Sequence, residues 1–305
     1  MESADKKFKK RSGKDLACYV VQIILYVVMA VVALSLTVPL VWMVINSFKG
    51  YIEYYQTQPF EFASKFSFDN YTYAIEHLNL TLSTSKGIFR YNFWSMIGYS
   101  FIYAAGSSFL NVFLSACCAY VISKYKFVGR ELIYTIGIVV MALPIIGAFP
   151  SAMVIRRALG VYDNVLLTIL TGPSTAFSGM VFLILYAAFK AIPWDYAEAV
   201  FIDGGGHFKV FTQIMLPLIV PTCAVLFILG FIGNWNDYES FLIWMPSTAN
   251  LAYGMFYYQE YSSATGATAP SILAGFVIVA IPTSALYLAS QKLVNSKFTV
   301  GGLKG

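Results

Sequence analysis

Between residues 190 and 217, acidic residues and glycines interrupt a chain that is otherwise strongly apolar. Asp195, Glu198 and Asp203 supply carboxylates, and the run Gly204–Gly206 permits a sharp turn of the backbone. A short helix is predicted before the turn because apolar residues recur at helical spacing, at Trp194, Ala197, Val200 and Phe201. Isolated helices of this length are marginal in water. The pattern therefore predicts either two short helices that dock on a partner protein or an amphipathic loop that lies on lipid headgroups.

A second polar group, Asn234, Trp235, Asn236 and Asp237, lies near the end of a later apolar run. Amides and carboxylates can hydrogen-bond a solute, an indole ring can stack on it, and a carboxylate at membrane depth usually faces a cavity or a partner. The four residues are therefore candidates for a solute path or an outer gate. Polar packing between helices, with an aromatic belt at the membrane interface, predicts the same composition, and both interpretations stay open.

Composition indicates the solvent in which these groups must be positioned. The 305 residues are 58% hydrophobic and only 11% charged, whereas soluble domains carry roughly 25% charged residues. A membrane span needs about 20 apolar residues in a helix. Pro144 and Pro150, and the sequence TGPS at 171–174, predict bends in two of the runs. Six spans are predicted, at 16–45, 93–122, 132–155, 164–189, 214–244 and 271–291.

The basic residues predict the orientation of the spans, because Lys and Arg concentrate on the cytoplasmic side. Placing both termini inside puts 14 of the 20 Lys and Arg residues in cytoplasmic segments. The run 16–45 is also too long for a signal peptide and is expected to stay in the product. The predicted organisation is a cytoplasmic segment 1–15, a permease domain 16–291 and a cytoplasmic tail 292–305. Within the domain, 46–92 is an extracytoplasmic loop and 190–217 is cytoplasmic.

Catalytic and metal chemistry are not predicted. The spans lack ionisable residues apart from Asp237 and Glu239. The sequence SGKD at 12–15 lacks the first glycine and the hydroxyl residue of a phosphate-binding loop, so this chain is not expected to hydrolyse ATP. The four cysteines lie in apolar runs without metal-ligand spacing. We expect no catalytic residue, no metal and no cofactor on this chain.

The segment 197–217 resembles the signature of permease subunits in bacterial ATP-binding-cassette importers. The residues that fit the signature at full spacing are Glu198, Ala199, Gly204, Ile214, Leu216 and Pro217. Val200 replaces the usual second alanine, and Gly205 and Gly206 are expected to loosen the corner. Other motifs resemble the carbohydrate, maltose-type branch: NSFK at 46–49, FDNY at 68–71, SKYKFVGR at 123–130, GNWNDY at 233–238 and FTVGGLKG at 298–305.

The resemblance implies an all-α, six-span membrane protein with the type I importer permease fold. It implies a second permease subunit, two ATPase subunits that use ATP, an extracytoplasmic solute-binding protein and membrane lipid as partners, with no nucleic acid. Segment 193–216 would couple ATP hydrolysis to transport, Glu198 through polar contacts and Gly204 through the turn, and Asp195 and Asp203 join this candidate set. A sugar or oligosaccharide is the expected solute. The alternatives are a polyamine, phosphate or amino acid as solute, a passive channel, and a membrane-embedded enzyme.

Overall fold

The computed structural model describes residues 13–143, 148–172 and 176–298. The basic N-terminal residues 1–12, Pro144, the last two residues of TGPS, and the tail residues 299–305 lie outside the described ranges. The predicted roles of the two terminal segments are therefore not tested.

The chain is mostly helical, with one two-stranded antiparallel sheet. In chain order the elements are α1 (Gly13–Ser47), α2 (Tyr51–Gln56), α3 (Asp69–His77), β1 (Leu80–Thr84), β2 (Gly87–Tyr91), α4 (Phe93–Lys124), α5 (Arg130–Ala142), α6 (Ala148–Ala158), α7 (Val165–Thr171), α8 (Met180–Ala191), α9 (Asp195–Ile202), α10 (His207–Lys209), a π-helix (Val210–Met215), α11 (Leu216–Trp235), α12 (Glu239–Trp244), α13 (Leu251–Glu260), α14 (Ser262–Thr265) and α15 (Ala269–Phe298).

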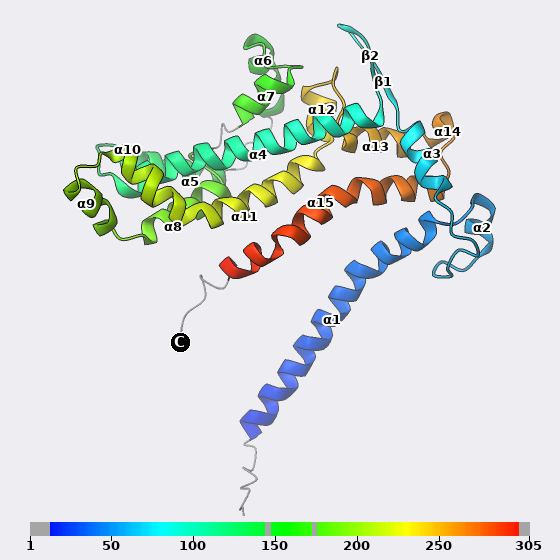
Figure 1. Ribbon diagram of the computed structural model, residues 1–305, viewed down its shortest axis with the longest axis horizontal. Coiled ribbons are helices and arrows are strands. Elements are labelled where there is room, and N and C mark those ends of the chain that lie inside the picture. The colour runs from blue at the N-terminus through cyan, green and yellow to red at the C-terminus, as the bar shows by residue number, and fades with distance from the viewer. Residues whose placement is uncertain (1–12, 144–147, 173–175, 299–305) are drawn as a thin grey trace, which may run out of the picture.

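Helices α4 and α11 lie side by side along the length of the molecule (Figure 1). Their backbones approach closely where Gly230 faces Ser108, because a Cβ atom on this glycine would lie 3.2 Å from the Ser108 Oγ. Small residues at such crossings allow the close van der Waals packing that holds membrane helices together. This pair of helices connects α9 and α10 at one end of the molecule with α12 and the hairpin at the other (Figure 1).

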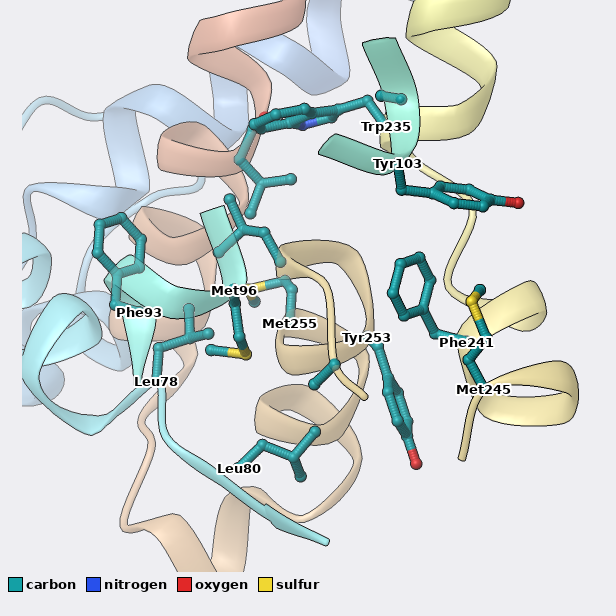
Figure 2. Packing of buried hydrophobic residues seen from close by; sticks show 14 of the residues in the cluster. Leu78, Leu80, Phe93, Met96, Tyr103, Trp235, Phe241, Met245, Tyr253 and Met255 are labelled. Carbon is teal, nitrogen blue, oxygen red and sulfur yellow. The ribbon is translucent and has the colours of Figure 1, made fainter. Parts of the chain in front are cut away.

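Two groups of buried apolar side chains pack along these helices, one toward each end. The cluster at the end that carries the hairpin, which we call the outer cluster, includes Met96, Tyr103, Trp235, Phe241 and Met255 (Figure 2). The cluster at the end that carries α9 and α10, which we call the inner cluster, includes Tyr120, Phe189, Ala197, Val210 and Met215. Both candidate sites are therefore built on packed helix ends.

Four helical stretches of the described residues are long and apolar enough to cross a membrane: Cys18–Ser47, Phe93–Lys124, His207–Trp235 and Ala269–Gln291. A fifth is obtained if α8 and α9, which are bent by 65° at their junction, are counted together. The predicted span 132–155 is divided between α5 and α6, and 164–189 is divided between α7 and α8. The interruptions fall in the two runs where Pro144, Pro150 and TGPS predicted bends. Six continuous spans are not present in the described residues.

The predicted fifth span, 214–244, is wrong at both ends. The helical stretch begins earlier, at His207, and α11 already ends at Trp235. The carboxylate of Asp237 accepts a hydrogen bond from the Ser240 backbone N–H at 2.9 Å. Short polar side chains that bond the backbone in this way compete with a continuing helix, and α12 then begins as a separate element.

Helix α1 exposes apolar side chains around its whole circumference from Tyr19 to Leu40. The C-terminal end of α1 lies near α15, and the two helices diverge toward the N-terminal end of α1 (Figure 1). A helix that is apolar on every side is suited to lipid or to a protein partner within the membrane.

The NSFK and FDNY motifs contact each other directly, which the sequence did not reveal. The side-chain amide of Asn70 donates to the carbonyls of Ser47 and Lys49, each at 2.8 Å. The hydroxyls of Ser47 and Tyr71 lie 2.6 Å apart. Polar side chains buried in this way must be hydrogen-bonded to be tolerated. The two motifs thus form a polar clasp at the end of α1.

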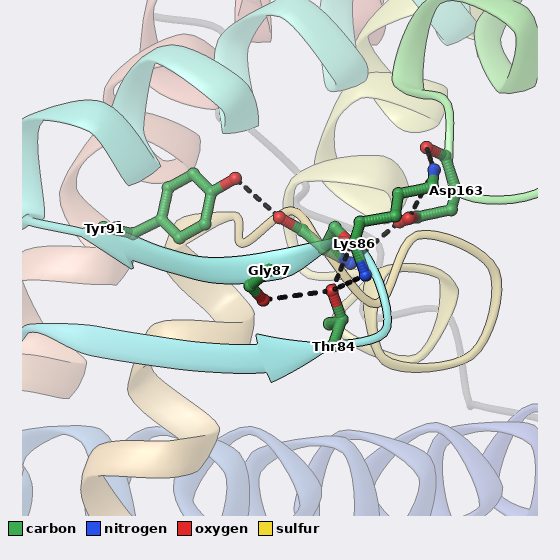
Figure 3. Close-up of polar contacts among 6 residues, drawn as sticks. Thr84, Lys86, Gly87, Tyr91 and Asp163 are labelled. Atoms are coloured by element: carbon green, nitrogen blue, oxygen red, sulfur yellow. Dashed lines mark hydrogen bonds and ion pairs between the residues drawn. The ribbon is translucent and has the colours of Figure 1, made fainter.

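Segment 46–92 is folded, although the sequence predicted only a loop. Its β1–β2 hairpin is attached to the following loops by the side chain of Asp163 (Figure 3). The Asp163 carboxylate lies 2.7 Å from the Lys86 Nζ and accepts a hydrogen bond from the Ser247 backbone N–H at 2.8 Å. The Tyr91 hydroxyl also donates to the Ser247 carbonyl, at 2.6 Å. We call this group of contacts the hairpin latch.

Replacing Asp163 with asparagine is expected to loosen the hairpin latch. The Asp163 side chain is 3% exposed and that of Lys86 is 55% exposed, so most of the effect arises from the buried partner groups. Asparagine keeps one oxygen for the Ser247 N–H but loses the charge and the oxygen that face Lys86, so a loss of roughly 1 kcal/mol is expected. Asparagine tolerates the positive φ of 61° at this position, so the change tests the charge rather than the backbone. Trypsin cleavage after Lys86 should become faster than in wild type. The matched control is Asp69→Asn, which makes the same change on the exposed first turn of α3.

The same latch has a defined pH dependence. Burial alone would raise the pKa of Asp163, but the hydrogen bonds from Lys86 and Ser247 outweigh it and lower the pKa below its usual value. Because the folded pKa is lowered, this stabilisation is fully present above the unfolded value of about 4 and is lost as the pH falls through the lower folded value. Hairpin cleavage at a constant protease activity should therefore not change between pH 7 and 5. A latch that opened near pH 6 would contradict this assignment.

Candidate functional site

The segment predicted to dock forms two short helices at one end of the molecule, α9 and α10, with a corner between them (Figure 1). We call residues 193–210 the coupling corner. Ala197 is fully buried, and Trp194, Val200 and Phe201 pack against the inner cluster. The helical face predicted from the sequence is therefore confirmed.

The turn of the coupling corner is tightly specified. The Gly204 N–H donates to the Phe201 carbonyl at 3.0 Å, and the Gly205 N–H donates to the Val200 carbonyl at 2.8 Å. With Gly204 at φ +75°, these two bonds form a Schellman motif, which satisfies carbonyls at the end of α9. A Cβ atom on Gly205 would lie 2.4 Å from the Val200 Cγ1. The expectation that Gly205 loosens the corner is therefore wrong, because only glycine fits there.

The polar candidates of the corner face outward. Asp195, Glu198, Ala199 and Asp203 are all exposed. Within the described ranges, none of the three carboxylates forms an ion pair or a side-chain hydrogen bond. Exposed apolar side chains lie among them, notably Ile202 at 85% and Phe208 at 79% exposed. Exposed apolar groups that are rimmed by polar side chains mark a surface that contacts a protein partner or a membrane.

The last three residues of the signature shape the helix and do not form the exposed corner. Ile214 and Leu216 are half-buried, and Leu216 packs against the inner cluster. Pro217 has no N–H, and its ring crowds the carbonyl of the preceding turn in an ordinary α-helix. The turn before Pro217 is a π-helix, in which the Leu216 N–H bonds the Phe211 carbonyl five residues back. The corner is thereby continuous with α11.

Tyr125 and His207 are two contact residues that the sequence analysis missed. The Tyr125 hydroxyl lies 3.0 Å from the His207 Nδ1, although the residues are 82 positions apart. Tyr125 belongs to the SKYKFVGR motif and His207 opens α10. The position of the motif directly after an apolar run was the only available signal.

Asn234 and Trp235 of the polar cluster are engaged in packing between helices. The Asn234 amide donates to the Ser108 Oγ at 2.9 Å, which joins α11 to α4. The Trp235 indole is fully buried, and its N–H donates to the Val279 carbonyl of α15 at 3.1 Å. Of the two interpretations, packing describes these two residues.

Asn236 and Asp237 are more accessible. Asn236 is exposed, and its side-chain amide donates to the Ile232 carbonyl of the preceding helix α11 at 2.8 Å. Asp237 is half-buried and accepts the Tyr103 hydroxyl at 3.1 Å. A separate groove of about 400 Å³ between α4 and α11 is lined by apolar side chains, among them Phe109 and Phe227, and does not include the polar cluster.

Comparison with known proteins identifies the family. Residues 111–300, which contain the coupling corner and the polar cluster, match the family described as binding-protein-dependent transport system inner membrane component. The diacetylchitobiose uptake system permease protein NgcG of Streptomyces coelicolor is 28% identical over 87% of this chain and 83% of its own length. The sulfoquinovosyl glycerol transport system permease protein SmoH of Agrobacterium fabrum is 30% identical over 68% of this chain and 72% of its own length.

A solved structure shows the same fold. One chain of a bacterial ABC transporter involved in the import of the acidic polysaccharide alginate has a TM-score of 0.67 and 20% identity to this chain, with 92% of this chain and 98% of that chain covered. The sequence motifs, the apolar helices and the family match agree. The chain therefore belongs to the family of inner-membrane components of binding-protein-dependent transport systems, and it is a membrane-embedded transport subunit rather than an enzyme.

Proposed function

We propose that this chain is a permease subunit of an ATP-driven importer that takes up a sugar or oligosaccharide. The observation that carries the proposal is the family match over residues 111–300 together with relatives along most of the chain whose names specify carbohydrate transport. The maltodextrin transport system permease protein MdxG of Bacillus subtilis is a further such relative, 28% identical over 64% of this chain. Polyamine, phosphate and amino-acid import have no comparable support.

In this proposal the coupling corner docks on an ATPase subunit at the cytoplasmic face. Glu198, Asp195 and Asp203 provide polar contacts, Ala199 allows close approach, and Gly204 sets the turn. Ile214, Leu216 and Pro217 connect the corner to α11. Both termini are cytoplasmic, and the chain crosses the membrane six times when the divided helices are counted as spans. ATP is bound and hydrolysed by two partner subunits, not by this chain.

The remaining partners are a second permease and an extracytoplasmic solute-binding protein. Two permease subunits would enclose the solute path, and closure of the ATPase pair would switch access from one side of the membrane to the other as a rigid-body transition. Asn236 and Asp237 are the residues of the polar cluster that remain accessible to a solute, through amide and carboxylate hydrogen bonds.

The proposal is tested by purifying the chain from its native membrane in mild detergent and identifying the co-purified proteins by mass spectrometry. Recovery of a phosphate-binding-loop ATPase and a second permease is the expected result. The Glu198→Arg variant should lose the ATPase and retain the permease, because it reverses the charge at an exposed position of the docking surface. Lys65→Glu, a charge reversal in the predicted extracytoplasmic loop, is the matched control.

The solute is tested on the reconstituted complex with its binding protein. Oligosaccharides are expected to stimulate ATP hydrolysis, whereas spermidine, phosphate and amino acids are not. Repeated recovery of this chain alone, or stimulation by a non-sugar solute only, would contradict the proposal.

A further inference from the structure

Helix α4 is not adjacent to the coupling corner in the sequence, yet the C-terminal end of α4 lies against the corner (Figure 1). The corner is joined by the backbone to α8 on one side and to α11 on the other. The α8 junction is bent by 65°, so it is a poor route for transmitting a rigid movement. Helix α11 is joined to the corner by a continuous helical backbone, whereas α4 can follow the corner only through side-chain contacts with the corner itself and with the helices beside it.

Contacts from the end of α4 reach both sides of the corner. The Tyr125 hydroxyl bonds the His207 Nδ1 of α10 at 3.0 Å, and its ring lies 5.8 Å from the Trp194 ring ahead of α9. The neighbouring Lys124 Nζ donates to the Ile192 carbonyl. The Tyr120 hydroxyl lies 3.1 Å from the Tyr125 hydroxyl. Tyr125 is thus the one residue of this group that contacts both α10 and the residue directly before α9, and it is also supported from within α4.

The other end of α4 contacts the polar cluster and its neighbours. The Tyr103 hydroxyl bonds the Asp237 carboxylate at 3.1 Å, and the Ser108 Oγ accepts the Asn234 amide at 2.9 Å. The Ser100 hydroxyl oxygen accepts the backbone N–H of Leu251 at 2.8 Å. One unbroken helix of 32 residues therefore connects the coupling corner with the region where Asn236 and Asp237 are accessible.

We infer that Tyr125 is a positioning residue for coupling, which fixes the corner to α4 so that a movement of the corner displaces the outer polar cluster. This inference rests on the proposed function, because it assigns a route for the movement that the ATPase would generate. It adds α4 as a second route beside α11, which is joined to the corner by the backbone, and it makes the bond between Tyr125 and His207 the contact through which α4 is attached to the corner.

The test compares Tyr125→Phe with wild type in the complete importer, reconstituted with its partner subunits in liposomes. The readout is the number of ATP molecules hydrolysed per solute molecule imported, which a purely structural defect in the amount of folded complex does not change. Loss of one net hydrogen bond corresponds to roughly a fivefold change in an equilibrium. We therefore expect the number of ATP molecules hydrolysed per imported solute molecule to rise about fivefold in Tyr125→Phe. Tyr134→Phe is the matched control, since it removes a hydroxyl from a ring on α5 that packs against the Tyr186 ring.

A double-mutant cycle with His207 makes the test specific. His207→Ala should raise the ratio as Tyr125→Phe does, and the double variant should be no worse than either single variant, because both remove the same bond. His207→Asn, whose side-chain oxygen can occupy the position of Nδ1, should retain most of the coupling. An unchanged ratio in Tyr125→Phe and His207→Ala, or additive effects in the double variant, would overturn the inference. Failure of the wild-type complex to couple ATP to uptake would instead overturn the proposed function.

Discussion

Replacing Gly205 with alanine is expected to abolish solute-stimulated ATP hydrolysis, whereas the same change at Gly206 should leave it near the wild-type rate. A Cβ atom on Gly205 would lie 2.4 Å from the Val200 Cγ1 and 2.9 Å from the Val200 carbonyl oxygen. Val200 packs against the inner cluster, so it cannot move aside without disturbing that packing. Gly206 has φ −96° and no heavy atom within 4 Å of a Cβ position, so alanine fits.

Gly204 should fall between these two positions. Its Cβ position is open, but its φ of +75° is in the left-handed region, which costs an L-residue roughly 1–2 kcal/mol. Alanine is therefore expected to impair coupling partly, and asparagine less, because asparagine tolerates this conformation.

The measurement for this glycine series is ATP hydrolysis and solute uptake by the reconstituted complex, with size-exclusion chromatography to show that each variant is folded. The expected order of residual coupling is Gly206→Ala, Gly204→Asn, Gly204→Ala and Gly205→Ala, from highest to lowest. Wild-type transport in a correctly assembled Gly205→Ala complex would show that the tight turn is not required.

The sequence was sufficient to locate the coupling corner because its signals are local. The apolar face of α9 and the glycine that ends it depend on residues within about two turns of one another, and local periodicity and φ preferences describe such segments well. The long apolar helices were located for the same reason. The prediction of 93–122 corresponds to α4 at Phe93–Lys124, and that of 271–291 lies within α15.

Interruptions within apolar segments could not be predicted from hydropathy. The sequence around Trp235 and Asp237 was predicted to be part of one apolar span, and α11 ends there because the Asp237 carboxylate accepts the Ser240 N–H. The β1–β2 hairpin was missed because its strands have five residues each and its two-residue turn, Ser85 and Lys86, lacks the Asn-Gly or Asp-Gly signal.

Contacts between distant segments were out of reach of a single sequence. The bond between Tyr125 and His207 joins residues 82 positions apart, and that between Lys86 and Asp163 joins residues 77 positions apart. Nothing in the local pattern of either partner specifies the other. The resemblance to a family pointed to the SKYKFVGR motif, but only the fold places its tyrosine against the corner.

Substitution of Trp235 by alanine is expected to destabilise the protein strongly, whereas substitution of its neighbour Asn236 by alanine is expected to affect transport without affecting stability. The Trp235 ring is fully buried and lies 5.0 Å from the Phe101 ring and 5.8 Å from the Phe231 ring. Truncation of a large buried aromatic residue costs roughly 3–5 kcal/mol. Lipid cannot enter the interior of a packed bundle to replace the lost contacts, so the van der Waals packing is lost outright.

Two further variants separate the contributions within this pair of residues. Trp235→Phe removes the hydrogen bond to the Val279 carbonyl and part of the buried ring but keeps an aromatic ring in place, so the loss of stability is expected to be smaller than for alanine. Asn236→Asp retains the shape of an exposed side chain and changes its charge, which should alter uptake if this residue lies on the solute path.

The measurement is the temperature at which the detergent-solubilised complex loses its size-exclusion peak, alongside uptake in liposomes. Packing predicts a large fall in that temperature for Trp235→Ala and none for the Asn236 variants. A solute path that includes Trp235 predicts the opposite for that residue, namely lost uptake at an unchanged transition temperature. Trp235 and Asn236 are adjacent in sequence, but Trp235 is buried and Asn236 is exposed. Comparing their variants therefore distinguishes a motif residue that packs between helices from one that contacts the solute.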